Sequence, residues 1–398
     1  MQYIRRQIES KLLESITQFS SVAVTGPRQT GKSTLLQNTL PHYKYCSFDD
    51  PLMREQALSD PEFFLDSIGE NVILDEIQFV PSLLSYIKIK IDENRNKKGL
   101  YVFTGSQKFS MIKNLSDSLA GRVALLELLP FSFTEVHKVH KTGGVSGRFF
   151  LTALNSAYPE PIIQKGMDIK LWYGSYIQTY LERDIKTIYN IGDIRDFQRF
   201  IHLLATRCGQ VLNLSSFAND LGVSVPTINR WLSILEASRL VYLLQPYYRN
   251  LNKRVTKSPK IYFTDCGLVT YLTGISDQDA LLQGPLAGAL FENYCIQETL
   301  KVFFNRGIQP NIYYIRTNNN FEIDLIIERG LDIIPIEIKL SKTPKREMGK
   351  NISSLKELFP KLNFKKGYLL CLSDKTFSLN NDVDVITFSD YLNMCFHT

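Results

Sequence analysis

The apolar positions in the first 160 residues form short continuous runs that alternate with longer amphipathic segments. Four runs have the length of strands, and they cover residues 21–26, 43–50, 71–77 and 100–106. Short apolar runs separated by helix-length segments are typical of a parallel sheet with helices on its faces. This part of the chain therefore predicts an α/β domain.

The pattern changes twice along the rest of the chain. Between 168 and 244, apolar residues recur at intervals of three and four, which predicts helices. From about 285, a helix is followed by two strand-like runs, another helix and another strand, which predicts a separate second α/β unit. The expected fold is a multi-domain α/β protein, and its three expected parts are 1–160, 161–284 and 285–398.

Composition narrows the class of protein. A chain of 398 residues is too long for one compact core, and 44% apolar with 22% charged residues is typical of globular domains. The formal charge of +6 permits a polyanionic partner without requiring one. Neither a signal peptide nor an apolar run of membrane-spanning length is visible, and the six scattered cysteines indicate a reducing compartment. We expect a cytoplasmic protein that does not enter a membrane.

A phosphate-binding loop follows the first strand. Residues 26–33 read GPRQTGKS, which fits G-x-x-x-x-G-K-[ST], a pattern expected by chance about 0.01 times in such a chain. Its backbone N–H groups would surround the phosphates, Lys32 would reach the β- and γ-phosphates, and Ser33 would bind Mg²⁺. A Gly-rich turn that binds nothing is the alternative. The predicted cofactors are ATP and Mg²⁺, and the predicted binding residues are Gly26, Pro27, Arg28, Gln29, Thr30, Gly31, Lys32, Ser33 and Thr34.

The strand-like run VILDE supplies the carboxylates that a nucleotide site also needs. Asp75 would be a partner of Mg²⁺, and Glu76 would be the catalytic base that orients the attacking water. The alternative is that both residues only cap the segment that follows.

Three further residues are candidates for sensing the γ-phosphate. The run FTGS ends the next strand with hydroxyl groups at Thr104 and Ser106, although a simple strand-ending turn would look the same. Arg122, in LAGRV, would act as a catalytic arginine finger or sensor, or it is an ordinary surface arginine.

These motifs occur in an order that resembles a widespread prokaryotic family of AAA+ ATPases. The resemblance is carried by GPRQTGKSTLL, SFDDP, VILDEIQ, FTGSQ and SLAGRVALLELLPFSFTE, over roughly residues 1–140. It implies an AAA+ nucleotide-binding core and supports the roles given to Glu76 and Arg122. It is compatible with a homo-oligomer, since AAA+ proteins often form rings, and also with a monomer or dimer.

The resemblance continues beyond the ATPase core. YLERDI, KSPKIYFTDCGL and the run YYIRT…FEIDLII…PIEIKLS are similar to the domain of unknown function that accompanies these ATPases. Nearly the whole chain is covered in this way.

The middle part contains a predicted helix-turn-helix, expected to be winged. Residues 214–247 read as two helices with a turn at Gly222, followed by an extended run. One interpretation places Thr227, Asn229 and Arg230 in a DNA groove, and the other is a module that packs on the ATPase core or on another subunit. The basic run 249–260 would follow a phosphate backbone, be solvated, or reach a neighbour's nucleotide.

The C-terminal part carries a set of acidic residues on two successive strands. Because side chains alternate in a strand, Asp324 and Glu337 would converge beside Lys339 if the two strands pair. Two carboxylates can hold Mg²⁺, and a nearby ammonium group can help to activate a water. The alternative is a hairpin whose charges are simply solvated.

With Glu292 on the preceding helix, this order resembles the PD-(D/E)XK nuclease fold. The resemblance implies a metal site of Glu292, Asp324 and Glu337 with catalytic roles for Asp324, Glu337 and Lys339, although Ile323 replaces the usual proline. The segment 339–366 holds nine Lys or Arg residues against two acids, so DNA is the expected partner. The alternative is a nucleotide-dependent regulatory switch with a degenerate nuclease fold that binds DNA or protein without cleaving.

Overall fold

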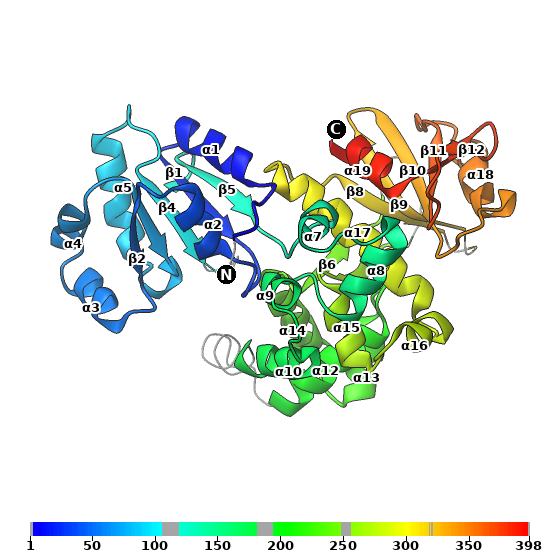
Figure 1. The fold of residues 1–398 in the computed structure, drawn as a ribbon, viewed down its shortest axis with the longest axis horizontal. Coiled ribbons are helices and arrows are strands. Elements are labelled where there is room, and N and C mark those ends of the chain that lie inside the picture. Colours follow the sequence, from blue (N-terminus) through cyan, green and yellow to red (C-terminus); the bar gives the residue numbers. More distant parts are fainter. Residues whose placement is uncertain are drawn as a thin grey trace.

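The computed structural model describes residues 3–105, 119–180, 194–247, 256–317, 319 and 321–396. An N-terminal α/β unit lies on one side of the molecule (Figure 1). The helical middle region and a C-terminal α/β unit lie together on the other side (Figure 1). The expected α/β multi-domain fold is confirmed.

The N-terminal sheet is parallel, and its described strands have the order β2-β3-β4-β1-β5. In register, Thr25 lies opposite Gly105 on one side and Glu127 on the other. The segments that follow these three strands therefore leave from one edge of the sheet, where ligands bind in open parallel sheets. The strands are β1 (Ser21–Thr25), β2 (Lys44–Ser47), β3 (Val72–Asp75), β4 (Tyr101–Gly105) and β5 (Val123–Glu127).

Helices cover both faces of this sheet, and aspartates begin two of them. Asp50 and Asp60 accept hydrogen bonds from backbone N–H groups of the first turns that follow, each with a proline at the next position. Apolar residues of α1 and α2 pack on one face, and residues of α3, α4 and α5 pack on the other. The helices are α1 (Glu9–Gln18), α2 (Lys32–Thr39), α3 (Pro51–Ser59), α4 (Pro61–Ile68) and α5 (Leu83–Glu93).

Among its described residues, the middle region is helical apart from one antiparallel pair of strands, β6 (Val241–Leu244) and β7 (Lys260–Phe263). Two of its helices, α13 and α14, are joined at Gly222, whose φ of 69° suits glycine. The helices and turn lie where the sequence predicts them, while the tip between β6 and β7 falls outside the described residues. The helices are α7 (Phe133–Val139), α8 (Gly144–Leu154), α9 (Pro159–Ile163), α10 (Ile169–Tyr180), α12 (Ile194–Thr206), α13 (Leu214–Leu221), α14 (Val225–Ala237), α15 (Cys266–Thr273) and α16 (Gln278–Gln283).

The C-terminal sheet is mixed, with the order β12-β13-β11-β10-β9-β8 among its described strands. Strands β8, β9 and β10 are antiparallel neighbours, whereas β11 runs parallel to β10 after a helix connection. A two-residue turn at Gly330 and Leu331 joins β9 to β10. The elements are α17 (Ala287–Asn305), β8 (Ile312–Arg316), β9 (Glu322–Arg329), β10 (Asp332–Ile338), α18 (Lys350–Leu358), β11 (Gly367–Leu370), β12 (Phe377–Ser378), β13 (Val383–Ile386) and α19 (Phe388–Phe396).

The C-terminal unit packs closely against the middle region. One apolar core runs from α8 and α12 through α17 to Leu325 and Ile336 in the C-terminal sheet. Helix α17 is buried around most of its circumference because elements of both regions pack against it. The backbone after β6 also joins the edge strand β8, since Tyr247 N donates to Tyr314 O at 2.8 Å.

Within the described part of the chain, we find no helix with the length and hydropathy needed to cross a membrane.

Candidate functional site

The phosphate-binding loop connects β1 to α2 at the carboxyl edge of the N-terminal sheet. Gly26 has a φ of 144°, and a Cβ atom there would lie 2.1 Å from the carbonyl oxygen of Leu128. Gly31 has a φ of 86° and begins α2 without a side-chain cap, so the helix N-terminus faces the loop. Lys32 Nζ donates to the carbonyl oxygens of Gly26 and Pro27 at 3.0 and 2.9 Å.

Asp75 lies at the end of β3 beside this loop. Ser33 Oγ donates to its two carboxylate oxygens at 3.1 and 2.9 Å, so the two expected Mg²⁺ partners are in contact. Thr104 and Tyr45 also donate to Asp75. Burial, followed by the hydrogen bond to Asp75, raises the pKa of Tyr45 to about 12, so the phenol stays a donor at neutral pH.

Glu76 is the next residue, and it has an unusual backbone. Its φ of 56° and ψ of 44° are left-handed, which is uncommon for a residue with a side chain and is frequent at functional sites. Its N–H donates to Thr104 Oγ1 at 3.3 Å, and its carboxylate accepts from Gln78. This conformation places Glu76 in the lining of the cavity that also contains Lys32 and Ser33.

The cavity has a volume of about 650 Å³, within the usual range for a small-molecule site. One wall is the loop and the start of α2. The opposite walls come from parts of the sequence that local motifs did not indicate. These residues are Tyr3, Ile4 and Arg6 near the N-terminus, Phe131 after β5, and Pro159, Glu160, Ile163, Tyr176 and Thr179 in the middle region.

Arg6 fixes the N-terminal segment against the phosphate-binding loop. Its guanidinium group donates to Thr30 O at 2.8 Å and Leu129 O at 2.7 Å, and it pairs with Glu135 at 3.1 Å. Burial acts to raise the pKa of Glu135, but Arg6 and the N–H groups of Ser132 and Gln7 outweigh it and hold the pKa below its ordinary value. The segment 129–135 is therefore tied to the phosphate-binding loop by a buried ion pair.

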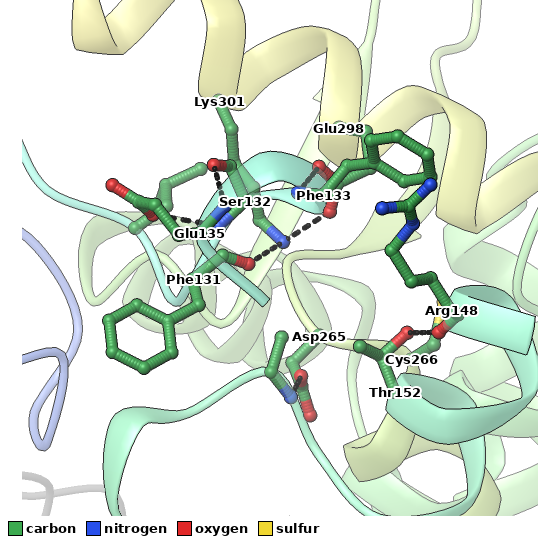
Figure 2. A network of polar contacts seen from close by, with 12 residues as sticks. Phe131, Ser132, Phe133, Glu135, Arg148, Thr152, Asp265, Cys266, Glu298 and Lys301 are labelled. Carbon is green, nitrogen blue, oxygen red and sulfur yellow. Dashed lines mark hydrogen bonds and ion pairs between the residues drawn. The ribbon is translucent and has the colours of Figure 1, made fainter. Parts of the chain in front are cut away.

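The same segment is also held by residues of α17, as Figure 2 shows. Lys301 donates to Phe131 O at 2.9 Å and to Glu298 at 2.6 Å. Glu298 in turn accepts from Phe133 N at 2.6 Å. Since Phe131 lines the cavity, these contacts connect the cavity directly to the helix that precedes the C-terminal sheet.

Of the three predicted sensor residues, Thr104 and Arg122 lie among the described residues. Ser106 lies outside the described residues, and Thr104 is fully buried and bonded to Asp75 rather than lining the cavity. Arg122 precedes β5 and lies beside the start of β1, at the sheet edge opposite the loop. It pairs with Asp92 at 2.8 Å.

The predicted role of Arg122 at this chain's own nucleotide is therefore wrong, because the strands separate them by five residues, or about 16 Å. Action on a neighbouring subunit's nucleotide stays a prediction.

The C-terminal structure brings Asp324, Glu337 and Lys339 together, as expected from strand pairing. The register that pairs Ile336 with Leu325 places Glu337 next to Asp324 on the same face. Lys339 Nζ lies 2.9 Å from Asp324 Oδ2 and 2.7 Å from Glu337 Oε2. Ile338 N also donates to Asp324 Oδ2 at 2.8 Å.

The two carboxyl groups have opposite titration behaviour. Burial acts to raise the pKa of Asp324, but Lys339, Lys260 and the Ile338 N–H outweigh it and lower the pKa. Burial and the charge of Asp324 raise the pKa of Glu337 to about 8, despite Lys339. Oε1 of Glu337 is buried and accepts no hydrogen bond. A cation beside this oxygen would satisfy it and favour the ionised form.

The predicted metal set of Glu292, Asp324 and Glu337 does not form as a group. Among the residues that the structure describes, no three His, Cys, Asp or Glu side chains are arranged to hold a metal ion. Oε1 of Glu292 instead accepts from Lys260 Nζ at 2.9 Å and from Tyr262 OH at 2.5 Å.

Lys260 was expected in a basic loop, and this expectation is wrong. It is the first residue of β7, 2% exposed, and pairs with carboxylates of the C-terminal unit because β7 packs beside α17.

The predicted DNA-reading face lies on α14. Asn229 and Arg230 are exposed and Thr227 is partly exposed, while Ile228 and Trp231 are buried against the other helices. Of the basic run, residues 249–255 lie outside the described residues, and Lys257 is exposed.

Three family models match successive parts of the chain. The AAA domain family matches residues 18–137, and two domains of unknown function, DUF8612 and DUF4143, match residues 149–279 and 287–391.

Two solved structures are similar at low identity. The Walker-type ATPase PABY2304 of Pyrococcus abyssi is 16% identical, with a TM-score of 0.42, over 67% of this chain and 95% of that chain. AMPPCP-bound DnaA from Aquifex aeolicus is 14% identical, with a TM-score of 0.30, over 58% of this chain and 86% of that chain.

Two relatives are similar over most of this chain. Uncharacterized protein MJ1544 of Methanocaldococcus jannaschii is 24% identical over 386 residues, covering 89% of this chain and 82% of that protein. Uncharacterized protein Rv2008c of Mycobacterium tuberculosis is 30% identical over 342 residues, covering 85% of this chain and 75% of that protein. The chain therefore belongs to the same family as Rv2008c, and within that family it is a protein with an N-terminal AAA domain and a C-terminal DUF4143 domain.

Proposed function

We propose that this protein binds ATP with Mg²⁺ at the phosphate-binding loop and hydrolyses it. The observation that carries the proposal is the contact of Ser33 with Asp75 beside a cavity that Glu76 also lines. A serine hydroxyl and an aspartate in contact are the pair that holds Mg²⁺ in P-loop NTPases, where the ion neutralises charge on the β- and γ-phosphates.

In this proposal, the loop, Glu76 and the cavity wall bind different parts of ATP and of the attacking water. The uncapped N-terminus of α2 binds the phosphates, and Lys32 exchanges its two loop carbonyls for phosphate oxygens. Glu76 accepts a hydrogen bond from the attacking water and orients it. The apolar and aromatic wall that includes Phe131 and Tyr176 suits the base and ribose, since such walls line most cofactor sites.

The test is Glu76→Gln, which keeps the size of the side chain and removes its basicity. We expect unchanged Mg·ATP affinity and a turnover number reduced about 10²- to 10⁴-fold, the usual contribution of a general base. Titration calorimetry and phosphate release measure the two quantities. Glu70→Gln, an exposed surface glutamate paired with Lys97, is the matched control. Normal turnover in the Glu76 variant would place the base elsewhere.

A second activity is favoured by the buried, unpaired oxygen of Glu337. We propose that Asp324 and Glu337 hold a divalent cation beside Lys339 and that this site acts on DNA phosphodiesters. The donor set fits such an ion, because two carboxylates in contact, one with a raised pKa, gain from a cation. A bound cation would supply electrophilic assistance at phosphorus, and Lys339 would orient the attacking water.

DNA as the partner is supported by charge. The segment 339–366 has nine basic residues and two acidic ones, and α14 exposes Asn229 and Arg230. The competing proposal is a regulatory switch in which nucleotide controls binding of DNA or protein and no strand is cut. The ammonium group of Lys339, which lies between Asp324 and Glu337, supports the regulatory switch without cleavage.

One experiment separates the two proposals. DNA cleavage is measured in a matrix of Mg²⁺, Mn²⁺ or no metal against ATP, ADP or no nucleotide, for the wild type, Lys32→Ala and Asp324→Ala. Metal-dependent nicking that Asp324→Ala eliminates supports a nuclease. Salt-dependent DNA binding without any product supports the switch. Cleavage that survives Asp324→Ala would come from a contaminant.

A further inference from the structure

Lys260 places a buried positive charge within the C-terminal carboxylate cluster. Its Nζ lies 2.9 Å from Glu292 Oε1 on α17 and 2.5 Å from Glu322 Oε1 at the start of β9. The backbone fixes this position, because Lys260 pairs with Leu244 of β6 and forms a bridge with Val211. An element of the middle region thus inserts a cation between two elements of the C-terminal unit.

The charge of Lys260 is stabilised by its surroundings. Burial acts to lower its pKa, but Glu292, Asp324 and Glu322 outweigh burial and raise the pKa above the ordinary value. Tyr262, two residues along β7 and therefore on the same face, donates to the same Glu292 oxygen. The carboxylate on α17 therefore already has an ammonium and a phenol as partners.

The two halves of the carboxylate cluster differ in whether they contain a buried carboxylate oxygen without a hydrogen bond. On the Glu292 side, Lys260 bridges two carboxylates, as a divalent ion would. On the Glu337 side, Lys339 bridges Asp324 and Glu337, yet Oε1 of Glu337 is buried without a hydrogen bond. An additional cation beside Glu337 would satisfy this oxygen, whereas Oε1 of Glu292 already has Lys260 and Tyr262 as partners.

We infer that Lys260 is an intramolecular counter-cation that takes the position of a second divalent ion. The cluster then binds one divalent cation, through Asp324 and Glu337, and Glu292 is not a ligand. This inference rests on the proposed metal site and concerns its composition. Lys260 is a positioning residue, since it acts by holding Glu292 and Glu322 away from the metal.

The first test measures binding of Mn²⁺ alone, by titration calorimetry and by the loss of the free-ion electron paramagnetic resonance signal. We expect one ion per wild-type chain. Asp324→Asn should weaken Mn²⁺ binding by at least about tenfold, whereas Glu292→Gln should weaken it much less. If Glu292→Gln weakens Mn²⁺ binding as much as Asp324→Asn, Glu292 is a ligand and the inference is wrong.

The second test removes the ammonium group. Lys260→Ala leaves Glu292 and Glu322 facing a space of the right charge, so we expect one more Mn²⁺ per chain than in the wild type. Lys260→Arg keeps the charge and should keep the wild-type stoichiometry, and the exposed Lys342→Ala is the matched control. A folded Lys260→Ala variant with no additional ion would overturn the inference. If that variant does not fold, the Mn²⁺ affinities of Glu292→Gln and Asp324→Asn decide whether Glu292 is a ligand.

The outcome also separates this inference from the proposed function. Without Mn²⁺ binding by the wild type, the proposed metal site fails. In that case, an ion gained by Lys260→Ala still supports the role of Lys260. If neither the wild type nor Lys260→Ala binds Mn²⁺, both the proposed metal site and the inferred role of Lys260 are wrong.

Discussion

Replacement of Lys32 by Ala tests the nucleotide site most directly. The ammonium group lies 3.0 and 2.9 Å from the carbonyl oxygens of Gly26 and Pro27, and it would exchange these partners for phosphate oxygens. At an effective dielectric constant of about 20, a phosphate charge about 3 Å away attracts it by about 5 kcal/mol. The two carbonyl bonds given up are each worth about 1.5 kcal/mol.

The difference of about 2–3 kcal/mol corresponds to an affinity loss of about 30- to 150-fold for Mg·ATP. Titration calorimetry measures this loss, and circular dichroism confirms that the variant is folded. Folding should be little affected, because Lys32 lines the cavity and its removal leaves space that water can enter. Lys11→Ala, on the surface of α1, is the matched lysine control. A folded Lys32→Ala variant that binds Mg·ATP within about twofold of the wild type would refute this reasoning.

Three further predictions concern the structure around the site. Gly26→Ala should abolish ATP binding in a calorimetric titration, because its Cβ would lie 2.1 Å from a backbone oxygen; retained affinity would show that the loop can shift. Lys301→Met should lower the free energy of urea unfolding by about 3–5 kcal/mol, since it leaves Glu298 buried without its cation. Adding Glu298→Gln should recover part of this loss, and no recovery would argue against a charge effect. Glu135→Gln should be destabilising above about pH 4.5, the ordinary pKa, because the folded pKa is lower. In thermal unfolding scans, the difference in melting temperature between Glu135→Gln and the wild type should shrink as the pH falls below 4.5. A constant difference would contradict the assigned ionisation of Glu135.

Local sequence signals predicted the elements that depend on neighbouring residues. The loop of Lys32 and Ser33 follows from a contiguous pattern, and the contact of Ser33 with Asp75 follows because successive parallel strands end at one edge. The convergence of Asp324 and Glu337 was also predictable, since a two-residue turn fixes the register of an antiparallel pair. In each case, backbone geometry over a few residues determines the result.

Other residues were misplaced or missed because their environment comes from distant elements. Arg122 follows a glycine in a motif-rich stretch, but the register of β5 against β1 puts it at the far edge of the sheet. Lys260 is in a basic run, and only the packing of β7 beside α17 buries it among carboxylates. Phe131 and Tyr176 carry no motif, yet both line the cavity.

The sequence by itself therefore determined the chemistry of the phosphate-binding loop, the α/β character of the two ends and the pairing of β9 with β10. Only the tertiary structure decided which residues close the nucleotide cavity, that α17 links it to the C-terminal unit, and that Lys260 neutralises Glu292. The physical reason is that hydrogen-bonded turns and strand registers are specified over short stretches of chain. Burial and ion pairing depend instead on which distant surfaces come into contact, and here residues more than 100 positions apart, such as Phe131 and Lys301, share one buried network.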